Sequence, residues 1–250
     1  MKIIPLSEGS FTVDATKRFV PFEKYRERME DRPKGSLLVE IQPFALVTAS
    51  DILVLDSGLG FQVPGGGLQI HRNLREQGIQ PGEVTRVLVS HLHKDHAGGL
   101  GVEDPRTGMK QPTFPNALYY INRQELEYAF SMDGKSYHAE DFKFLAGQDR
   151  LVLLEGSGEV GNGIHYEWTG GHCPYHQVFL VEDGGIRAFF GGDVAPQASQ
   201  MKNRFMANYD YEPKRSMELR QEFAQRGRAG DWTFLFYHDT RTPSAQLAPV

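Results

Sequence analysis

Three histidines and one aspartate fall within six residues of the segment SHLHKDHAGGL, which covers residues 90–100. Neutral imidazole is a leading ligand for zinc, iron and manganese, and a carboxylate adds an oxygen ligand. His91 and His93 therefore suit one metal ion, whereas Asp95 and His96, displaced along the loop, suit a second ion nearby. A histidine-rich surface turn is the alternative, but the chain has only nine histidines and three of them fall here. The segment predicts a metal centre.

Three further fragments supply additional ligands beside predicted strands. They are TGGHCPYHQ with His172, FFGGDVAP with Asp193, and FLFYHD with His238. Imidazole and carboxylate groups suit zinc, iron, manganese and cobalt alike, so the ligand types do not select one metal. The predicted set is His91, His93 and His172 for one ion, Asp95, His96 and His238 for the other, and Asp193 as a bridge between them.

Two more side chains are candidates for holding the ligands in place. Ligand histidines usually donate their second ring N–H to a carboxylate or carbonyl, and Asp56 and His176 stand where they could support the centre. A plain strand residue is the alternative for His176. Cys173 adjoins His172, but neighbours along an extended chain point to opposite sides, which favours a buried thiol over a sulfur ligand.

The elements that must position these residues alternate between strands and helices. Residues 36–58 contain two or three β-rich runs and look like an antiparallel meander ending at Asp56. Apolar spacing predicts a helix over residues 68–79 that stops at Gly78, followed by a buried strand at 85–90. Further helices are expected at 122–130, with Asn122 as cap, at 138–147 and at 214–227. Further strands are expected at 117–121, 150–154, 164–168, 176–183, 186–193 and 232–239.

Composition describes an ordinary folded protein, for which we expect one α/β domain over residues 1–250. Hydrophobic residues make up 40% and charged residues 24%, and the net charge of −5 comes without a basic block, so no nucleic-acid partner is expected. The single cysteine excludes an intramolecular disulfide framework. The chain shows neither a signal-peptide core nor an apolar run of membrane-spanning length, so we expect no membrane partner and a cytoplasmic location.

The ordered set His-x-His-x-Asp-His, Gly-His, Gly-Asp and a late histidine resembles the metallo-β-lactamase superfamily. The resemblance covers nearly the whole chain, including VLDSGLG, which looks like the early Asp-x-Gly turn that supports the site from below. It implies an αββα four-layer sandwich of the α/β class, with a dinuclear metal site at one edge.

Details of the motifs narrow the resemblance to one branch. Asp193 differs from the cysteine ligand of zinc β-lactamases, and His93 differs from the glutamate of flavodiiron oxygen reducers. The twelve residues after His238 leave no room for the C-terminal domain of glyoxalase II. The segments VLVSHLHKDHAGGL, GHCPYHQ and MANYDYEPKRSMELR resemble YtnP-like N-acyl homoserine lactonases and methyl parathion hydrolases. Two departures are Cys173, where this branch often has Thr or Ser, and the lack of a tyrosine three residues after Asp193.

The expected chemistry follows from two cations that share an oxygen ligand. Such ions lower the pKa of a bound water towards about 7 and supply hydroxide near neutral pH. We therefore expect a hydrolase with two divalent metal ions, zinc foremost and iron, manganese or cobalt as alternatives, in which Asp95 and Asp193 serve catalysis through the metals.

The resemblance implies a lactone or related activated ester as the small-molecule substrate, with slower phosphotriester cleavage. A thioesterase or phosphodiesterase on the same metals, or a non-hydrolytic iron and oxygen-handling protein, are the alternatives. A homodimer is compatible with the sequence.

Aromatic and apolar residues outside the ligand motifs are candidates for a substrate pocket. In the segment RFVPF (residues 18–22) the candidates are the residues at positions 20 and 22, which are Val20 and Phe22. Phe19 precedes them. In the later segment MANYDYEP they are Met206 and Tyr209. Pockets are mostly apolar with a few polar anchors, which fits these residue types. Core packing would explain them equally well.

Overall fold

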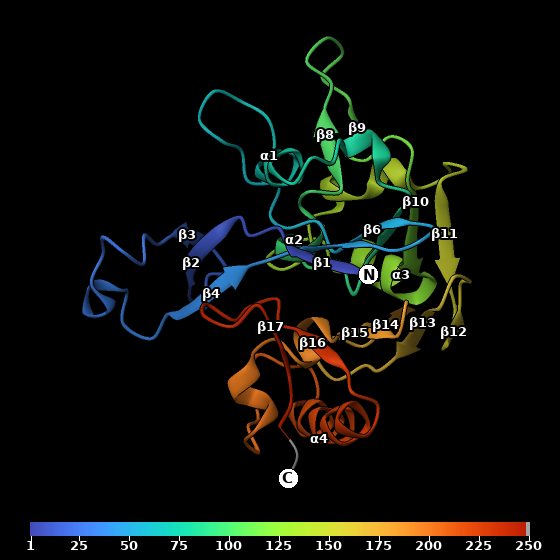
Figure 1. Cartoon of the computed structure of the whole chain (residues 1–250). Coiled ribbons are helices and arrows are strands. Elements are labelled where there is room, and N and C mark those ends of the chain that lie inside the picture. The colour runs from blue at the N-terminus through green and yellow to red at the C-terminus, as the bar shows by residue number, and fades with distance from the viewer. Residues whose placement is uncertain (249–250) are drawn as a thin grey trace.

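The computed structural model describes residues 1–248 and contains two six-stranded sheets packed face to face (Figure 1). The first sheet has the strand order β1 (Lys2–Pro5), β5 (Phe44–Val47), β6 (Ile52–Leu55), β7 (Arg86–Leu88), β10 (Leu118–Asn122) and β11 (Leu151–Leu154). The second has the order β12 (Gly158–Glu159), β13 (Ile164–Trp168), β14 (Gln177–Asp183), β15 (Ile186–Phe190), β16 (Thr233–Leu235) and β17 (Ser244–Gln246).

Four helices and two small sheets complete the described residues 1–248. The helices are α1 (Gln69–Glu76), α2 (Lys94–Ala97), α3 (Arg123–Ser131) and α4 (Pro213–Ala229). Strands β3 (Phe19–Pro21), β2 (Gly9–Val13) and β4 (Leu37–Ile41) form one small sheet, and β8 (Gly101–Glu103) pairs with β9 (Lys110–Pro112). The 3-10 turns are η1 (Met29–Asp31), η2 (Pro81–Glu83), η3 (Ala139–Asp141), η4 (Lys143–Leu145), η5 (Gly192–Val194) and η6 (Ala198–Met201).

Strand alternation produces the four layers, because successive side chains point to opposite faces of a sheet. In β6, Leu53 and Leu55 join the cluster between the sheets, whereas Val54 joins the cluster that also contains residues of α1 and α3. In β15, Phe190 lies between the sheets and Phe189 packs with residues of α4. Helix α4 covers the second sheet at the bottom of Figure 1, and α1 lies above the first. The expected αββα sandwich is confirmed.

The expected helices at 68–79, 122–130 and 214–227 are present as α1, α3 and α4. The Asn122 side chain accepts a hydrogen bond from the backbone N–H of Glu125, which caps α3 as the sequence predicted. Gly78 follows α1 with a φ of 79°, a backbone conformation that favours glycine.

Two expectations about the elements were wrong. Residues 138–147 form η3 and η4 rather than one helix, because Phe142 between them leaves helical geometry (φ −138°, ψ −12°) and packs its ring into the core. Residues 36–58 are not one meander. The chain changes sheets at Pro43, which cannot donate to a strand ladder, so β4 pairs with β2 whereas β5 pairs with β6.

The strand directions bring several loops to one edge of the sandwich. Strands β6 and β7 are parallel, as are β15 and β16, so the loops that follow the strands of each pair leave at the same end. Asp56 follows β6, residues 89–97 follow β7, Asp193 follows β15 and His238 lies three residues beyond β16. Ligand candidates far apart in the sequence therefore meet at this edge.

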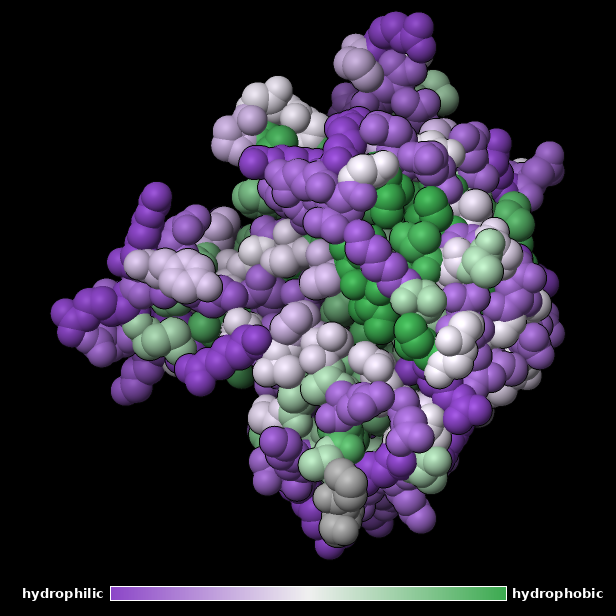
Figure 2. Space-filling view, viewed as in Figure 1, coloured by the Kyte–Doolittle hydropathy of each residue, from purple (hydrophilic) through white to green (hydrophobic). Residues whose placement is uncertain are grey.

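The surface in the view of Figure 2 is hydrophilic where it projects, and hydrophobic residues gather in the middle of the molecule, over the first sheet. Within residues 1–248, no helix is both long enough and apolar enough to cross a membrane.

Glu8 is a buried carboxyl group beneath the turn that follows β6. Its two oxygens accept hydrogen bonds from the backbone N–H groups of Leu59 (2.7 Å) and Phe61 (3.0 Å). Gly58 (φ 78°) lies against it, and a Cβ there would stand 2.4 Å from Glu8 Oε2. Burial raises the pKa of Glu8 to about 8, although the backbone N–H groups act in the opposite direction.

This raised pKa predicts a pH dependence of stability. The folded state keeps a proton that the unfolded state, with an ordinary pKa of 4.5, releases, so the contribution of Glu8 is lost as the pH rises towards 8. Urea unfolding of the metal-free protein between pH 5.5 and 9 should show this fall, and Glu8→Gln should flatten it. The exposed Glu76→Gln is the control and should keep the wild-type profile. Identical profiles for Glu8→Gln and wild type would contradict the assignment.

Candidate metal centre

Three histidines from two loops direct ring nitrogens at one point. His91 Nε2 lies 3.0 Å from His93 Nδ1, and His172 Nε2 lies 3.1 Å from the same atom. A hydrogen on His93 Nδ1 can be donated to only one of these two neighbours. Converging nitrogens at this separation are typical of the ligands of a single cation, and these donor atoms could hold a metal ion.

A second group stands beside the first. His96 Nε2 lies 3.7 Å and His238 Nε2 lies 3.5 Å from Asp95 Oδ2, and these three residues could also hold an ion. His96 is fully buried, whereas Asp95 and His238 border a cavity.

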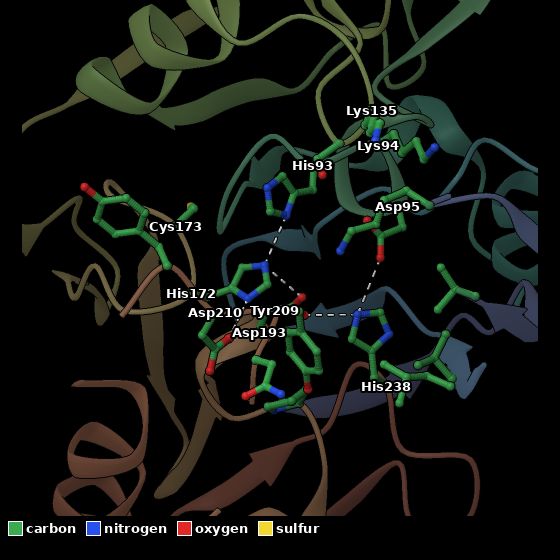
Figure 3. A pocket seen from close by; sticks show the side chains of 18 of the residues that line it. His93, Lys94, Asp95, Lys135, His172, Cys173, Asp193, Tyr209, Asp210 and His238 are labelled. Carbon is green, nitrogen blue, oxygen red and sulfur yellow. Dashed lines mark hydrogen bonds and ion pairs between the residues drawn. The ribbon is translucent and has the colours of Figure 1, made fainter. Parts of the chain in front are cut away.

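Asp193 lies between the two groups and gives one oxygen to each. Its Oδ1 is 3.1 Å from His96 Nε2 and 3.0 Å from His238 Nε2, whereas its Oδ2 is 3.2 Å from His172 Nε2 (Figure 3). The contact between His96 Nε2 and Asp193 Oδ1 lacks the alignment of a hydrogen bond, and within residues 1–248 both buried atoms are without a hydrogen-bond partner. Buried polar atoms without partners are costly, and metal ligation would satisfy both. The donors therefore fit two cations.

Burial and charge set the protonation states of the donors in the metal-free chain. Burial, aided by repulsion among the imidazoles, holds the pKa values of His91 and His93 well below their usual range. Burial would raise the pKa of Asp193, but His238, His96 and His172 outweigh it and keep that pKa well below its usual range. Burial would lower the pKa values of His96 and His238, but the Asp193 carboxylate outweighs it and raises both. In the metal-free chain His91 and His93 therefore favour the neutral form that metal binding requires, whereas His96 and His238 would release protons when a metal binds.

Asp56 supports two ligand candidates, His96 directly and His91 through Ser90. Its Oδ2 lies 2.7 Å from His96 Nδ1 and accepts from Ser90 Oγ at 2.7 Å, while its Oδ1 accepts from the Ser90 backbone N–H. Ser90 Oγ in turn lies 3.0 Å from His91 Nδ1. Asp56 thus contacts the ring nitrogen of His96 that faces away from Asp193.

His176 supports Asp193 through the backbone. Its Nε2 accepts from the Asp193 N–H at 3.2 Å, and its Nδ1 lies 3.0 Å from Thr169 Oγ1, so both ring nitrogens already have partners. Gly192 permits this approach, because a Cβ there would lie 2.7 Å from His176 Nε2 and the residue has a φ of 47°. The geometry matches an orienting residue.

Three supports were missed from the sequence. Asp210 Oδ1 lies 2.9 Å from His172 Nδ1, and the backbone carbonyl of Glu40 lies 2.7 Å from His238 Nδ1. Glu125 on α3 accepts from the backbone N–H of Leu92, at 2.9 Å, and from the Cys173 thiol, at 3.4 Å. It thereby joins the loops of His91, His93 and His172. Cys173 is buried, as expected.

A cavity of about 910 Å³ opens onto the centre and is bordered by His93, His172 and Asp193. Tyr209 lines it, and so does Phe19 of the RFVPF segment. Burial raises the pKa of Tyr209 to about 12, which keeps its phenol protonated near neutral pH.

Three of the pocket expectations were wrong. Position 20 does not supply a pocket residue, because Val20 is 51% exposed and does not line the cavity, whereas the neighbouring Phe19 does. Successive side chains of β3 point to opposite sides, so Val20 faces away from the cavity that Phe19 borders. Phe22 is buried away from the cavity. Met206 is 55% exposed, whereas its neighbour Phe205 lines the cavity instead.

A four-layer sandwich with histidine and aspartate donors at one edge defines this chain as a candidate metalloprotein. Residues 43–242 match the metallo-β-lactamase superfamily, and this chain belongs to it. The match contains every predicted ligand.

The N-acyl homoserine lactonase AttM of Agrobacterium fabrum is 36% identical to this chain over 119 residues. The match covers 43% of this chain and 40% of that relative, so the chain spans less than half the length of the lactonase.

Two solved structures share the fold. A probable metal-dependent hydrolase from Staphylococcus aureus has a TM-score of 0.77 at 22% identity, covering 97% of this chain and 91% of that one. AidC, a dizinc quorum-quenching lactonase in complex with a product, has a TM-score of 0.74 at 15% identity, covering 99% of this chain and 90% of that one.

The contact between Asp210 and His172 predicts an effect on metal affinity. Replacing a carboxylate that orients a ligand histidine typically costs about 10–100-fold in affinity. Asp210→Ala should therefore weaken zinc binding by about that factor in a competition titration with a chromophoric chelator. Asp149→Ala, at an exposed aspartate, is the control. Wild-type affinity in Asp210→Ala would show that the contact does not support binding.

Proposed function

We propose that this chain is a dinuclear metal-dependent hydrolase that opens lactones or related activated esters. The observation that carries the proposal is Asp193, whose two carboxylate oxygens face separate groups of donors. We assign His91, His93 and His172 to one ion, Asp95, His96 and His238 to the other, and Asp193 to both.

The superfamily implies divalent metal ions, and we propose zinc, as in the dizinc lactonase AidC, with iron, manganese and cobalt as ions that the same donors would accept. Bound metal ions of this kind activate water and polarise a carbonyl or phosphoryl oxygen.

The side chains around the centre would hold the ligand histidines in a fixed orientation. Asp56 fixes the orientation of His96 by accepting from its Nδ1–H, and Asp210 does the same for His172. The protonated phenol of Tyr209 lies on the cavity wall beside His172, where it can donate a hydrogen bond to a substrate oxygen. Asp95 and Asp193 serve catalysis by holding the ions.

The cavity supports hydrolysis over a purely binding role. Donors of both groups border it, so a substrate can reach the centre, whereas a sealed site would favour binding alone. Its volume of about 910 Å³ suits a lactone with an acyl chain, and Phe19 and Leu38 give it apolar surface. The partial match to the lactonase AttM points to the same substrate class.

Residues 1–250 are proposed to act as one catalytic domain on a small molecule. The cytoplasmic location, the homodimer and the absence of nucleic-acid and membrane partners remain predictions from the sequence.

The bridging role of Asp193 predicts that its removal lowers activity more than the removal of His176 does. Asp193→Ala removes an oxygen from both groups, whereas His176→Ala removes only a contact to the Asp193 backbone. With both variants at matched metal occupancy, kcat/KM for a lactone should fall at least about tenfold further in Asp193→Ala than in His176→Ala. Equal losses would mean that the two roles are wrongly assigned.

A hydrolysis screen of the metal-loaded protein tests the proposed function. N-hexanoyl homoserine lactone should be opened faster than a β-lactam, with a phosphotriester cleaved more slowly than the lactone. Proton release in weak buffer follows ring opening, and the coloured phenol follows phosphotriester cleavage. Turnover of a thioester or phosphodiester but of neither lactone nor phosphotriester would overturn the proposed substrate class.

A further inference from the structure

Three lysines line the cavity from segments far apart in the sequence. Lys17 lies in the turn between β2 and β3, Lys94 begins α2, and Lys135 lies in the loop after α3. The backbone N–H of Lys94 donates to the carbonyl oxygen of Ser136, which brings α2 and the Lys135 loop together. Figure 3 shows Lys94 and Lys135 side by side next to His93 and Asp95.

These amino groups have no partners of their own within residues 1–248, because none donates to an acceptor or lies within 4.0 Å of a carboxylate. The chain has ten lysines, and five of them do reach a partner: Lys2, Lys24, Lys110, Lys143 and Lys214. Three of the five unpaired lysines therefore border one cavity, in a chain whose net charge is −5.

The carboxylates of the same cavity are engaged elsewhere. Asp95 and Asp193 face the imidazoles of the metal centre, and Asp210 faces His172. Asp14 accepts from the backbone N–H and the hydroxyl of Thr16 within its own turn. Asp141, on the neighbouring η3, pairs with Lys110 at 2.8 Å. Among the described residues, no carboxylate of the cavity wall thus lies within 4.0 Å of a lysine amino group.

The backbone and an aromatic ring fix the positions of two of these lysines. Lys17 has a φ of 60°, a conformation that costs energy in a residue other than glycine and is often retained at ligand sites. The Lys94 amino group lies 5.8 Å from the centroid of the Phe19 ring, in the range of a cation–π contact. The Lys94 ammonium therefore stands over apolar surface, where its field is screened less than in open water.

We infer that the substrate carries a carboxylate or similar anionic group at the end remote from the scissile ester, and that Lys17, Lys94 and Lys135 select it. This inference rests on the proposed function and specifies its substrate class: an anionic lactone or ester whose reacting carbonyl lies at the metal centre. A concave site whose unpaired charges are all of one sign attracts ligands of the opposite sign, and salt weakens the attraction.

Two lactones of equal acyl length test the inference. N-adipoyl homoserine lactone places a terminal carboxylate where N-hexanoyl homoserine lactone has a methyl group. The ratio of their kcat/KM values on the same enzyme preparation cancels differences in metal occupancy. In wild type the ratio should favour the adipoyl compound about tenfold at low ionic strength and fall towards one in high salt. N-(6-aminohexanoyl) homoserine lactone, with the opposite charge, should be the poorest of the three.

Substitutions of the lysines show which residues cause the preference for the adipoyl compound. The combined variant Lys17→Gln, Lys94→Gln and Lys135→Gln should abolish the preference, and Lys94→Arg should keep it. Lys202→Gln, at an exposed unpaired lysine off the cavity, is the matched control for Lys135→Gln and should keep the wild-type ratio. A wild-type ratio of one or less, or one that the lysine variants leave unchanged, overturns the inference while leaving the proposed function intact.

Failure of the proposed function gives a different result. If neither lactone is opened, the same ratio is measured on the 4-nitrophenyl esters of hexanoic and adipic acid. A preference for the adipate that is lost in the lysine variants supports the inference without lactonase activity. If no ester is hydrolysed either, the proposed function fails and the inference fails with it.

Discussion

The structure depends on one buried carboxylate, that of Asp193, held among imidazoles from three loops. An ionised carboxylate away from water needs positive charge or hydrogen-bond donors. In the metal-free chain His238, His96 and His172 lower the pKa of Asp193, but its Oδ1 has no hydrogen-bond partner within residues 1–248. The nitrogens around it point at one another at separations near 3 Å. Cations between these atoms relieve both problems at once. The strand directions, the backbone carbonyl of Glu40 and the buried carboxylates of Asp56, Asp210 and Glu125 all serve this arrangement.

The supports of the centre come mostly from outside the ligand motifs. Glu125 on α3 binds the backbone between His91 and His93 and also the thiol beside His172, so one side chain couples two ligand loops. His176 binds the backbone rather than the carboxylate of Asp193. Such contacts set ligand orientation, while Tyr209 and the lysines of the cavity wall determine what can approach. Binding of metal and selection of substrate are thus assigned to different residues of one cavity.

The sequence predicted the features that leave a local pattern. Strand and helix periods predicted individual elements, the resemblance to the superfamily implied the four layers, and the close spacing of His91, His93, Asp95 and His96 indicated a metal centre. Features that depend on the path of the chain were not predictable. A backbone carbonyl such as that of Glu40 leaves no residue signature, and Phe142 interrupts the expected helix because its ring is needed in the core. Val20, Phe22 and Met206 failed as pocket residues because an aromatic or apolar type does not say which way a side chain faces.

The most direct test of the account is the number and position of metal ions around Asp193. Elemental analysis of the zinc-reconstituted protein should give two equivalents per chain. Anomalous scattering from its crystals should place two peaks roughly 3.5–4 Å apart, with one oxygen of Asp193 nearest to each. A single equivalent under saturating zinc, or two peaks of which only one lies beside Asp193, would contradict the dinuclear centre.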